Sequence, residues 1–204
     1  KINDIISSPT LNQAREYYCI GKSNFDKGLL KEALKFFLKA ESENSADFFT
    51  QSMLGTLYLY GVNADDNVVD PARAEHHFRL AARYAKAEKK LDENFTKLEA
   101  ESLFNASVAI YTQLDDNIVM SAREKFREML IEARNLAGQA ANIHPDGGLL
   151  EAEYHVAKYS ALLVEPQHAI PVLKKVIIAN RDYKKKAEED PAFEPVREYV
   201  TTTI

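Results

Sequence analysis

Small and large apolar residues recur at helical spacing along the first part of the chain. One apolar face has its members separated by three, three and one positions, as one side of a helix requires: Ala14, Tyr17, Ile20 and Gly21. A second face begins twelve residues later with the same periodicity: Ala33, Phe37 and Ala40. The segment between them, "SNFDKGLL", favours a tight turn. The pattern predicts two antiparallel helices that approach closely at Gly21 and Ala33, because these two residues lack bulk.

The large-small step of Ile20-Gly21 returns as Leu54-Gly55, 34 residues later. A second pair of helical faces surrounds this step, formed by Leu54, Gly55 and Tyr58 and then by Ala74, Phe78, Ala81 and Ala82. A long acidic loop joins the two faces. Asp70-Pro71 predicts where the second helix starts, because Asp caps free N–H groups and Pro tolerates the first helical position.

The rest of the chain repeats the theme less regularly. "DDNIVMSAR" echoes the earlier "DDNVVDPAR", which predicts a third hairpin with a similar loop. A fourth hairpin restores the original spacing, with Ala157 in the glycine position and Ala169, Leu173 and Val176 after it. Pro171 lies within its second helix, so we expect that helix to begin late or to bend. From Asp190-Pro191, a stripe of Phe193, Val196 and Val200 predicts a closing helix.

These residues and their period resemble the tetratricopeptide repeat superfamily, whose unit is a helical hairpin of 34 residues. The second hairpin resembles the Sel1-like branch through Leu54-Gly55, Gly61-Val62 and Ala81-Ala82. The resemblance implies an all-α fold, a right-handed α-α superhelix of about four hairpins in one domain, 1–204, closed by a capping helix. The predicted hairpins are 10–43, 46–86, 94–142 and 149–181, and the cap is 190–200.

In this superfamily the first helix of each hairpin lines a concave binding face. The resemblance therefore implies a non-catalytic module that binds a protein or peptide partner, through Arg15, Tyr18, Lys22, Phe25, Phe49, Ser52, Thr56, Tyr154 and Lys158. Tyr18 and Lys22 are four residues apart, as are Tyr154 and Lys158, which places an aromatic ring beside a cation on a helix. Two ordinary surface pairs would give the same spacing, and that alternative stays open.

Composition narrows the function classes. The chain has 204 residues, 46% hydrophobic and 28% charged, with a net charge of −5, so no nucleic-acid partner is expected. No apolar run is long enough to enter a membrane as a span. Nucleotide-binding and hydrolase motifs are missing, so we expect neither an enzyme nor a cofactor. The rival hypothesis is a regulatory or ligand-sensing domain of a larger enzyme or regulator.

Candidate metal and redox residues favour structural roles. Adjacent helical residues such as His76 and His77 point about 100° apart, so His77 is expected to pack and no metal site is expected. The acidic loop around Asp65 lacks the glycine and glutamate of a calcium-binding hand. Cys19, the only cysteine, is expected to be a partly buried apolar residue, which fits a cytoplasmic location.

The start of the chain leaves two alternatives open. The sequence begins at Lys1 and not at Met, which is compatible with a removed signal sequence. Ile2, Ile5 and Ile6 are apolar and would need cover, which a homodimer could supply.

Overall fold

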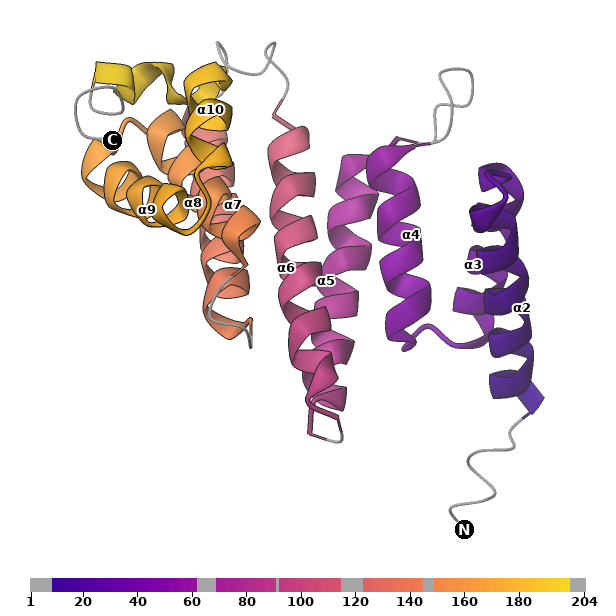
Figure 1. Cartoon of the computed structure of the whole chain (residues 1–204). Helices are drawn as coiled ribbons and strands as arrows, with labels where there is room; N and C mark the ends of the chain where they lie inside the picture. Colours follow the sequence, from indigo (N-terminus) through magenta and orange to yellow (C-terminus); the bar gives the residue numbers. More distant parts are fainter. Residues whose placement is uncertain (1–8, 62–68, 91, 115–122, 145–148, 199–204) are drawn as a thin grey trace. The chain divides into compact units, whose positions relative to one another are not determined.

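Consecutive helices pack in pairs throughout the described part of the chain, as Figure 1 shows for this computed structural model. The structure describes residues 9–61, 69–90, 92–114, 123–144 and 149–198, and these contain no β-strand. The all-α, helical-repeat fold class predicted from the sequence is therefore confirmed. The tetratricopeptide assignment and the handedness of the superhelix stay predictions.

The chain divides into two compact units, Lys1–Asp92 and Glu93–Ile204. In the first unit α2 packs on α3 and α4 packs on α5; the helices are α2 (Pro9–Asp26), α3 (Leu30–Glu43), α4 (Phe48–Tyr60) and α5 (Pro71–Glu88). In the second, α6 packs on α7 and α8 packs on α9, followed by a short helix and a 3-10 helix; these are α6 (Asn94–Thr112), α7 (Arg123–Ile143), α8 (Leu150–Leu162), α9 (Pro166–Ala179), α10 (Asp182–Glu189) and η2 (Pro191–Val196).

The first two hairpins close on contacts between a glycine and a phenylalanine ring. A Cβ atom added to Gly21 would lie 2.9 Å from the ring of Phe37. The same addition at Gly55 would lie 2.8 Å from the ring of Phe78. Both rings are fully buried. The close approach predicted from the sequence at Gly21 is thus present, and the phenylalanine on the second helix fills the space.

Helix starts and turns also follow the sequence signals. The Asp70 carboxylate accepts a hydrogen bond from the backbone N–H of Arg73 at 3.0 Å, and Pro71 begins α5, as predicted. Asp47 accepts from the N–H of Thr50 at 2.7 Å and begins α4 in the same way. Gly28 has a φ of 73°, a left-handed conformation that suits glycine and places the predicted turn between α2 and α3.

Near the end of the chain, the late start expected for the second helix of the fourth hairpin and the expected form of the closing segment need correction. Helix α9 begins at Pro166 and stays α-helical past Pro171 to Ala179. Pro171 is in the second turn, so the N–H that it lacks would have paired only with the Gln167 carbonyl in the first turn. The closing segment begins as the 3-10 helix η2, after a separate helix α10 that the sequence pattern did not predict.

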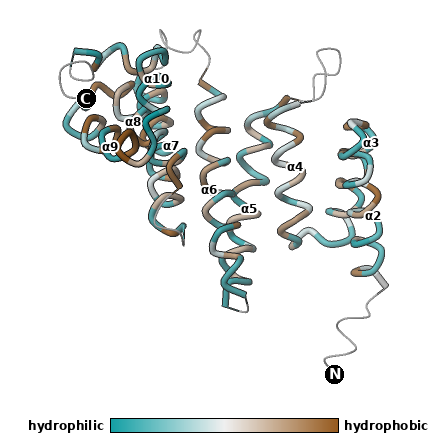
Figure 2. The backbone as a smooth tube through the Cα atoms, viewed as in Figure 1, coloured by the Kyte–Doolittle hydropathy of each residue, from teal (hydrophilic) through white to brown (hydrophobic). Residues whose placement is uncertain are grey.

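Apolar residues of the described helices gather on faces that meet other helices. Figure 2 shows hydrophobic and hydrophilic residues alternating along the helices. Within the described residues, no helix is both long enough and apolar enough to cross a membrane. The predicted acidic loop around Asp65, its echo at Asp115, and Ile2, Ile5 and Ile6 lie outside the described residues.

We predict opposite effects of alanine at two helical glycines. Gly21→Ala should lower the free energy of unfolding by about 1–3 kcal/mol, because its methyl group would overlap the Phe37 ring. Gly138→Ala should raise it by about 0.5–1 kcal/mol, because its methyl group would meet only Val156, at 3.9 Å, and alanine favours a helix. Urea unfolding followed by far-UV circular dichroism measures both. Equal effects at the two positions would contradict this account of the hairpin.

Candidate functional site

A hollow of about 650 Å³ opens between α2 and α4 in the first unit. It is lined by Leu11, Asn12, Ala14, Arg15, Tyr18, Cys19, Asn44, Asp47, Phe49 and Thr50. Three residues of the predicted binding face, Arg15, Tyr18 and Phe49, meet here. We call this feature the α2/α4 hollow.

Aromatic rings form one wall of the α2/α4 hollow. The ring of Tyr18 lies 5.7 Å from the buried Phe37 ring and 6.3 Å from Phe49, measured between centroids. Phe48 is buried, and its ring meets the Phe49 ring edge-on with 5.1 Å between the centroids. The buried Phe48 ring therefore supports the Phe49 ring at the rim of the hollow. Phe49 and Leu11 are each 47% exposed. Large apolar side chains at the mouth of a concave site are the usual anchors for a partner.

The polar groups of the α2/α4 hollow have different roles. Arg15 is exposed, and no ion pair engages it within the described residues. Asp47 is already used as the N-cap of α4. Burial, followed by the nearby Asp47 carboxylate, raises the pKa of Tyr18, so its hydroxyl remains a hydrogen-bond donor at neutral pH. Cys19 lines the hollow and is exposed, which corrects the expectation of a partly buried residue.

Four other predicted contact residues lie on α2 and α4 but do not line the hollow. The Lys22 ammonium forms an ion pair with Asp26 and lies 5.8 Å from the centroid of the Phe25 ring. The Thr56 hydroxyl donates to the Ser52 carbonyl at 2.9 Å within α4. The four predicted residues, Lys22, Phe25, Ser52 and Thr56, are each half-buried.

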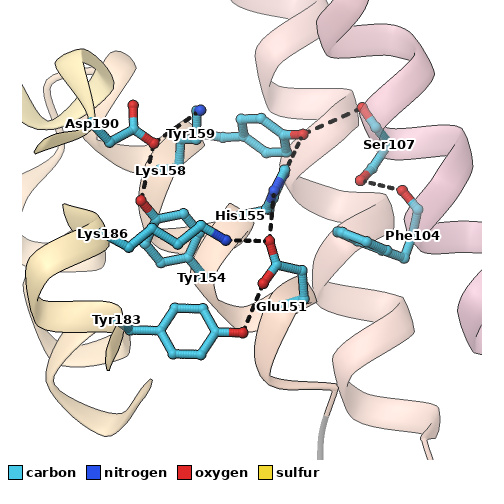
Figure 3. A network of polar contacts seen from close by, with 10 residues as sticks. All are labelled: Phe104, Ser107, Glu151, Tyr154, His155, Lys158, Tyr159, Tyr183, Lys186 and Asp190. Carbon is cyan, nitrogen blue, oxygen red and sulfur yellow. Dashed lines mark hydrogen bonds and ion pairs between the residues drawn. The ribbon is translucent and has the colours of Figure 1, made fainter. Parts of the chain in front are cut away.

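The last two predicted contact residues, Tyr154 and Lys158, belong to an internal network on α8 (Figure 3). Tyr154 is only 1% exposed, so its ring belongs to the core of the second unit and not to a free surface. Its hydroxyl donates to Asp190 at 3.0 Å, and the Lys158 ammonium pairs with the same carboxylate oxygen at 3.0 Å. Asp190 also accepts from the Ala192 N–H at 3.0 Å, which starts η2. These contacts hold the closing segment against α8.

A second branch of the network centres on Glu151 at the start of α8. Its carboxylate accepts from the Lys186 ammonium at 2.5 Å and from the Tyr183 hydroxyl at 2.7 Å, and both donors lie on α10. The pKa of Glu151 is lowered to about 2, first by His155, against partial burial, and then by Lys186 and Tyr183. Burial and the same carboxylate raise the pKa of Tyr183 to about 12. The carboxylate therefore stays charged and clamps α10 to α8.

The network reaches a third helix through the middle of α8. The Tyr159 hydroxyl lies 3.0 Å from His155 Nδ1 and 3.5 Å from the Ser107 carbonyl on α6. Burial strongly raises the pKa of Tyr159. Phe104 on α6 meets the His155 ring edge-on at 5.1 Å. These contacts tie His155 and Tyr159 of α8 to α6 within the second unit.

Within the first unit, His77 is a packing residue, as the sequence indicated. It is 7% exposed and stacks on Tyr58, with the ring planes 9° apart. Its Nδ1 lies 2.7 Å from the side-chain oxygen Oε1 of Gln51, and the side-chain NH₂ of Gln51 donates to Glu41 at 3.0 Å. Burial lowers the pKa of His77, although Glu41 opposes this. The cluster joins α3, α4 and α5.

The described residues contain no group of three or more His, Cys, Asp or Glu placed to hold a metal ion. No protein-family model matches the chain, and no curated protein matches its sequence. Since no relative indicates a function, the α2/α4 hollow is the basis for inferring one. The sequence pattern did not predict three residues that line this hollow: Leu11, Asn12 and Asn44. Leu11 could have been predicted, because it lies one helical turn before Arg15 on the same face of α2.

We predict that acid weakens the second unit through Glu151. A carboxyl group whose pKa falls from 4.5 to about 2 on folding stabilises the folded state above its ordinary pKa, and this stabilisation is lost as the pH drops towards 2. Glu151→Gln should therefore lower stability at pH 7 and flatten its decline between about pH 5 and pH 2. Urea unfolding at a series of pH values measures this.

Glu189→Gln is the matched control for Glu151→Gln. Glu189 is 69% exposed and, among the described residues, pairs with Lys185 one turn away on α10, at 3.8 Å. Such exposed pairs contribute little to stability, so the control should follow the native pH profile. A native profile for Glu151→Gln as well would show that the clamp on α10 does not depend on its charge.

Proposed function

We propose that the chain is a non-catalytic protein-interaction module whose α2/α4 hollow receives a short apolar segment of a protein or peptide partner. The observation that supports this most directly is the pairing of a hollow with exposed aromatic and aliphatic side chains at its rim. Phe49 and Leu11 are each 47% exposed beside the half-buried Tyr18. Covering such residues removes apolar area from water, which is the main favourable term in association.

Arg15 favours a partner that carries a negative charge. Its guanidinium lies at the wall of the hollow and is exposed, and the described residues place no carboxylate against it. A carboxylate of the partner could accept two parallel hydrogen bonds from it, which fixes orientation as well as adding affinity. The preferred segment therefore has two apolar anchors, for the aromatic wall, and one acidic residue.

The tetratricopeptide and Sel1-like resemblance supports the same role. In that superfamily the first helix of each hairpin presents the binding residues, and here α2 and α4 are the first helices of their hairpins. Arg15, Tyr18 and Phe49 were identified from that correspondence, and they line one hollow. Lys22, Phe25, Ser52 and Thr56 extend the proposed surface along the same two helices.

A peptide-display selection tests the proposal directly. A random peptide library is selected on the native chain and counter-selected on Phe49→Asp. We expect enriched peptides with two apolar residues and one acidic residue. Phe49→Ala should weaken the best peptide by about 1.4–2.8 kcal/mol, roughly tenfold to a hundredfold in Kd, because truncating an aromatic anchor removes most of its contact. Calorimetry or fluorescence polarisation measures the Kd.

Charge reversal at Arg15 and a control substitution in the second unit separate the contribution of the charge from that of the apolar anchors. Arg15→Glu should weaken peptides that carry the acidic residue and leave peptides without it nearly unchanged. Ile178→Ala removes a side chain that is 84% exposed on α9, in the second unit, and should leave every affinity as it was. Failure to enrich any peptide, or equal loss with Ile178→Ala, would count against the α2/α4 hollow as a binding site.

A further inference from the structure

A second hollow, of about 730 Å³, lies on α7, α8 and α9 within the second unit. It is lined by Arg134, Asn135, Gly138, Gln139, Asn142, Val156, Ser160, Gln167, His168, Pro171 and Val172. We call it the α7–α9 hollow. Its chemistry differs from that of the α2/α4 hollow, because neutral amides replace aromatic rings around it.

Three of the amides form a row along α7. Asn135, Gln139 and Asn142 are spaced by four and three residues, so they lie on one face of the helix. Gln167 on α9 also lines the hollow. All four are exposed, and no hydrogen bond engages their side chains within the described residues. Each amide offers two N–H donors and a carbonyl acceptor, which is the complement of a peptide main chain.

One further polar group of the hollow lacks a partner, and a second lacks its usual helical donor. The Ser160 side chain is fully buried, and its Oγ atom has no hydrogen-bond partner among the described residues. Pro171 has no N–H, so the carbonyl of Gln167, four residues earlier, loses its usual helical donor. A buried hydroxyl without a partner is costly, and a ligand that pairs with it recovers that free energy.

The charged groups at the hollow are already neutralised. Arg134 forms an ion pair with Glu165, whose carboxylate also accepts from His168 Nδ1 at 3.0 Å and from Arg127 at 3.3 Å. His168 and Arg134 together hold the pKa of Glu165 below its ordinary value, against the effect of desolvation. An anion would have to compete with this carboxylate, so the hollow favours a ligand that is neutral where it binds.

Gly138 keeps the hollow open. A Cβ atom at this position would meet only a methyl group of Val156, at 3.9 Å, so the space in front of α7 is not filled. The glycine lies between Asn135 and Gln139 in the sequence, where a larger side chain would stand in front of the amides.

We propose that the α7–α9 hollow binds an extended peptide segment through its main chain, with Asn135, Gln139, Asn142, Gln167 and Ser160 as hydrogen-bonding groups. The row from Asn135 to Asn142 rises about 10 Å along α7, which an extended chain of about three residues matches. Val156 and Val172 supply apolar parts of the lining. The proposal does not depend on the function proposed for the α2/α4 hollow.

Nuclear magnetic resonance on the full ¹⁵N-labelled chain tests this proposal. The probe is acetyl-(Ala)₃-N-methylamide, a neutral peptide with small side chains and blocked ends. We expect saturable shifts of the side-chain NH₂ signals of Asn135, Gln139 and Asn142. A matched depsipeptide, in which esters replace the central amides, should bind at least about fivefold more weakly, because it lacks N–H donors for the hollow.

Three variants give the proposal its controls. Gly138→Leu should weaken the probe at least about tenfold by filling the hollow, while Ile178→Ala, on α9 but outside the lining, should bind within about twofold of the native chain. Ser160→Ala, which keeps the shape of the buried site, should weaken binding about threefold or more. Circular dichroism verifies that each variant is folded. Absence of saturable shifts in the native chain, or undiminished binding by folded Gly138→Leu, would overturn the proposal.

Discussion

The close approach of two antiparallel helices at a residue without bulk is the constraint on which each described hairpin of the first unit depends. Gly21 meets the Phe37 ring and Gly55 meets the Phe78 ring, and neither contact leaves room for a methyl group. The rings are fully buried, so the contact excludes water and sets the distance between the helices. In the fourth hairpin Ala157 and Leu173, both fully buried, replace glycine and phenylalanine. A residue larger than glycine opposite a side chain smaller than phenylalanine conserves the total volume.

Because this constraint depends on residue size and spacing, the helix pairs that it closes could be predicted from the sequence. The pattern around Gly21 and Gly55 gave the two hairpins of the first unit, and Ala157 gave the fourth. Helix α10 was missed for a physical reason. Its sequence is mostly Lys and Glu, and only Ala187 is buried, so no apolar stripe marks it. It is held by polar contacts to Glu151, and such contacts leave no periodic signal in a sequence.

The candidate site was only partly predictable, and one comparison shows why. Tyr18 and Lys22 have the same spacing as Tyr154 and Lys158, and sequence reasoning treated the two pairs alike. Tyr18 is half-buried beside an open hollow, whereas Tyr154 is 1% exposed and bonded to Asp190. The difference arises because Asp190, which is 36 residues away from Tyr154, starts the closing 3-10 helix. Local spacing identifies a helix face but not the segment that covers it.

The same contrast bears on where binding is favourable. A polar group that is already satisfied inside the protein gains little from a partner, since binding would only exchange one hydrogen bond for another. On α8 the network centred on Glu151 and Asp190 uses its tyrosines, lysines and carboxylates, so that face contributes to stability. The groups that still gain from a partner are of two kinds: exposed rings near Arg15, and amides together with the buried hydroxyl of Ser160. Under the two proposals, the two hollows recognise different features of a ligand: apolar side chains at the α2/α4 hollow and the peptide main chain at the α7–α9 hollow.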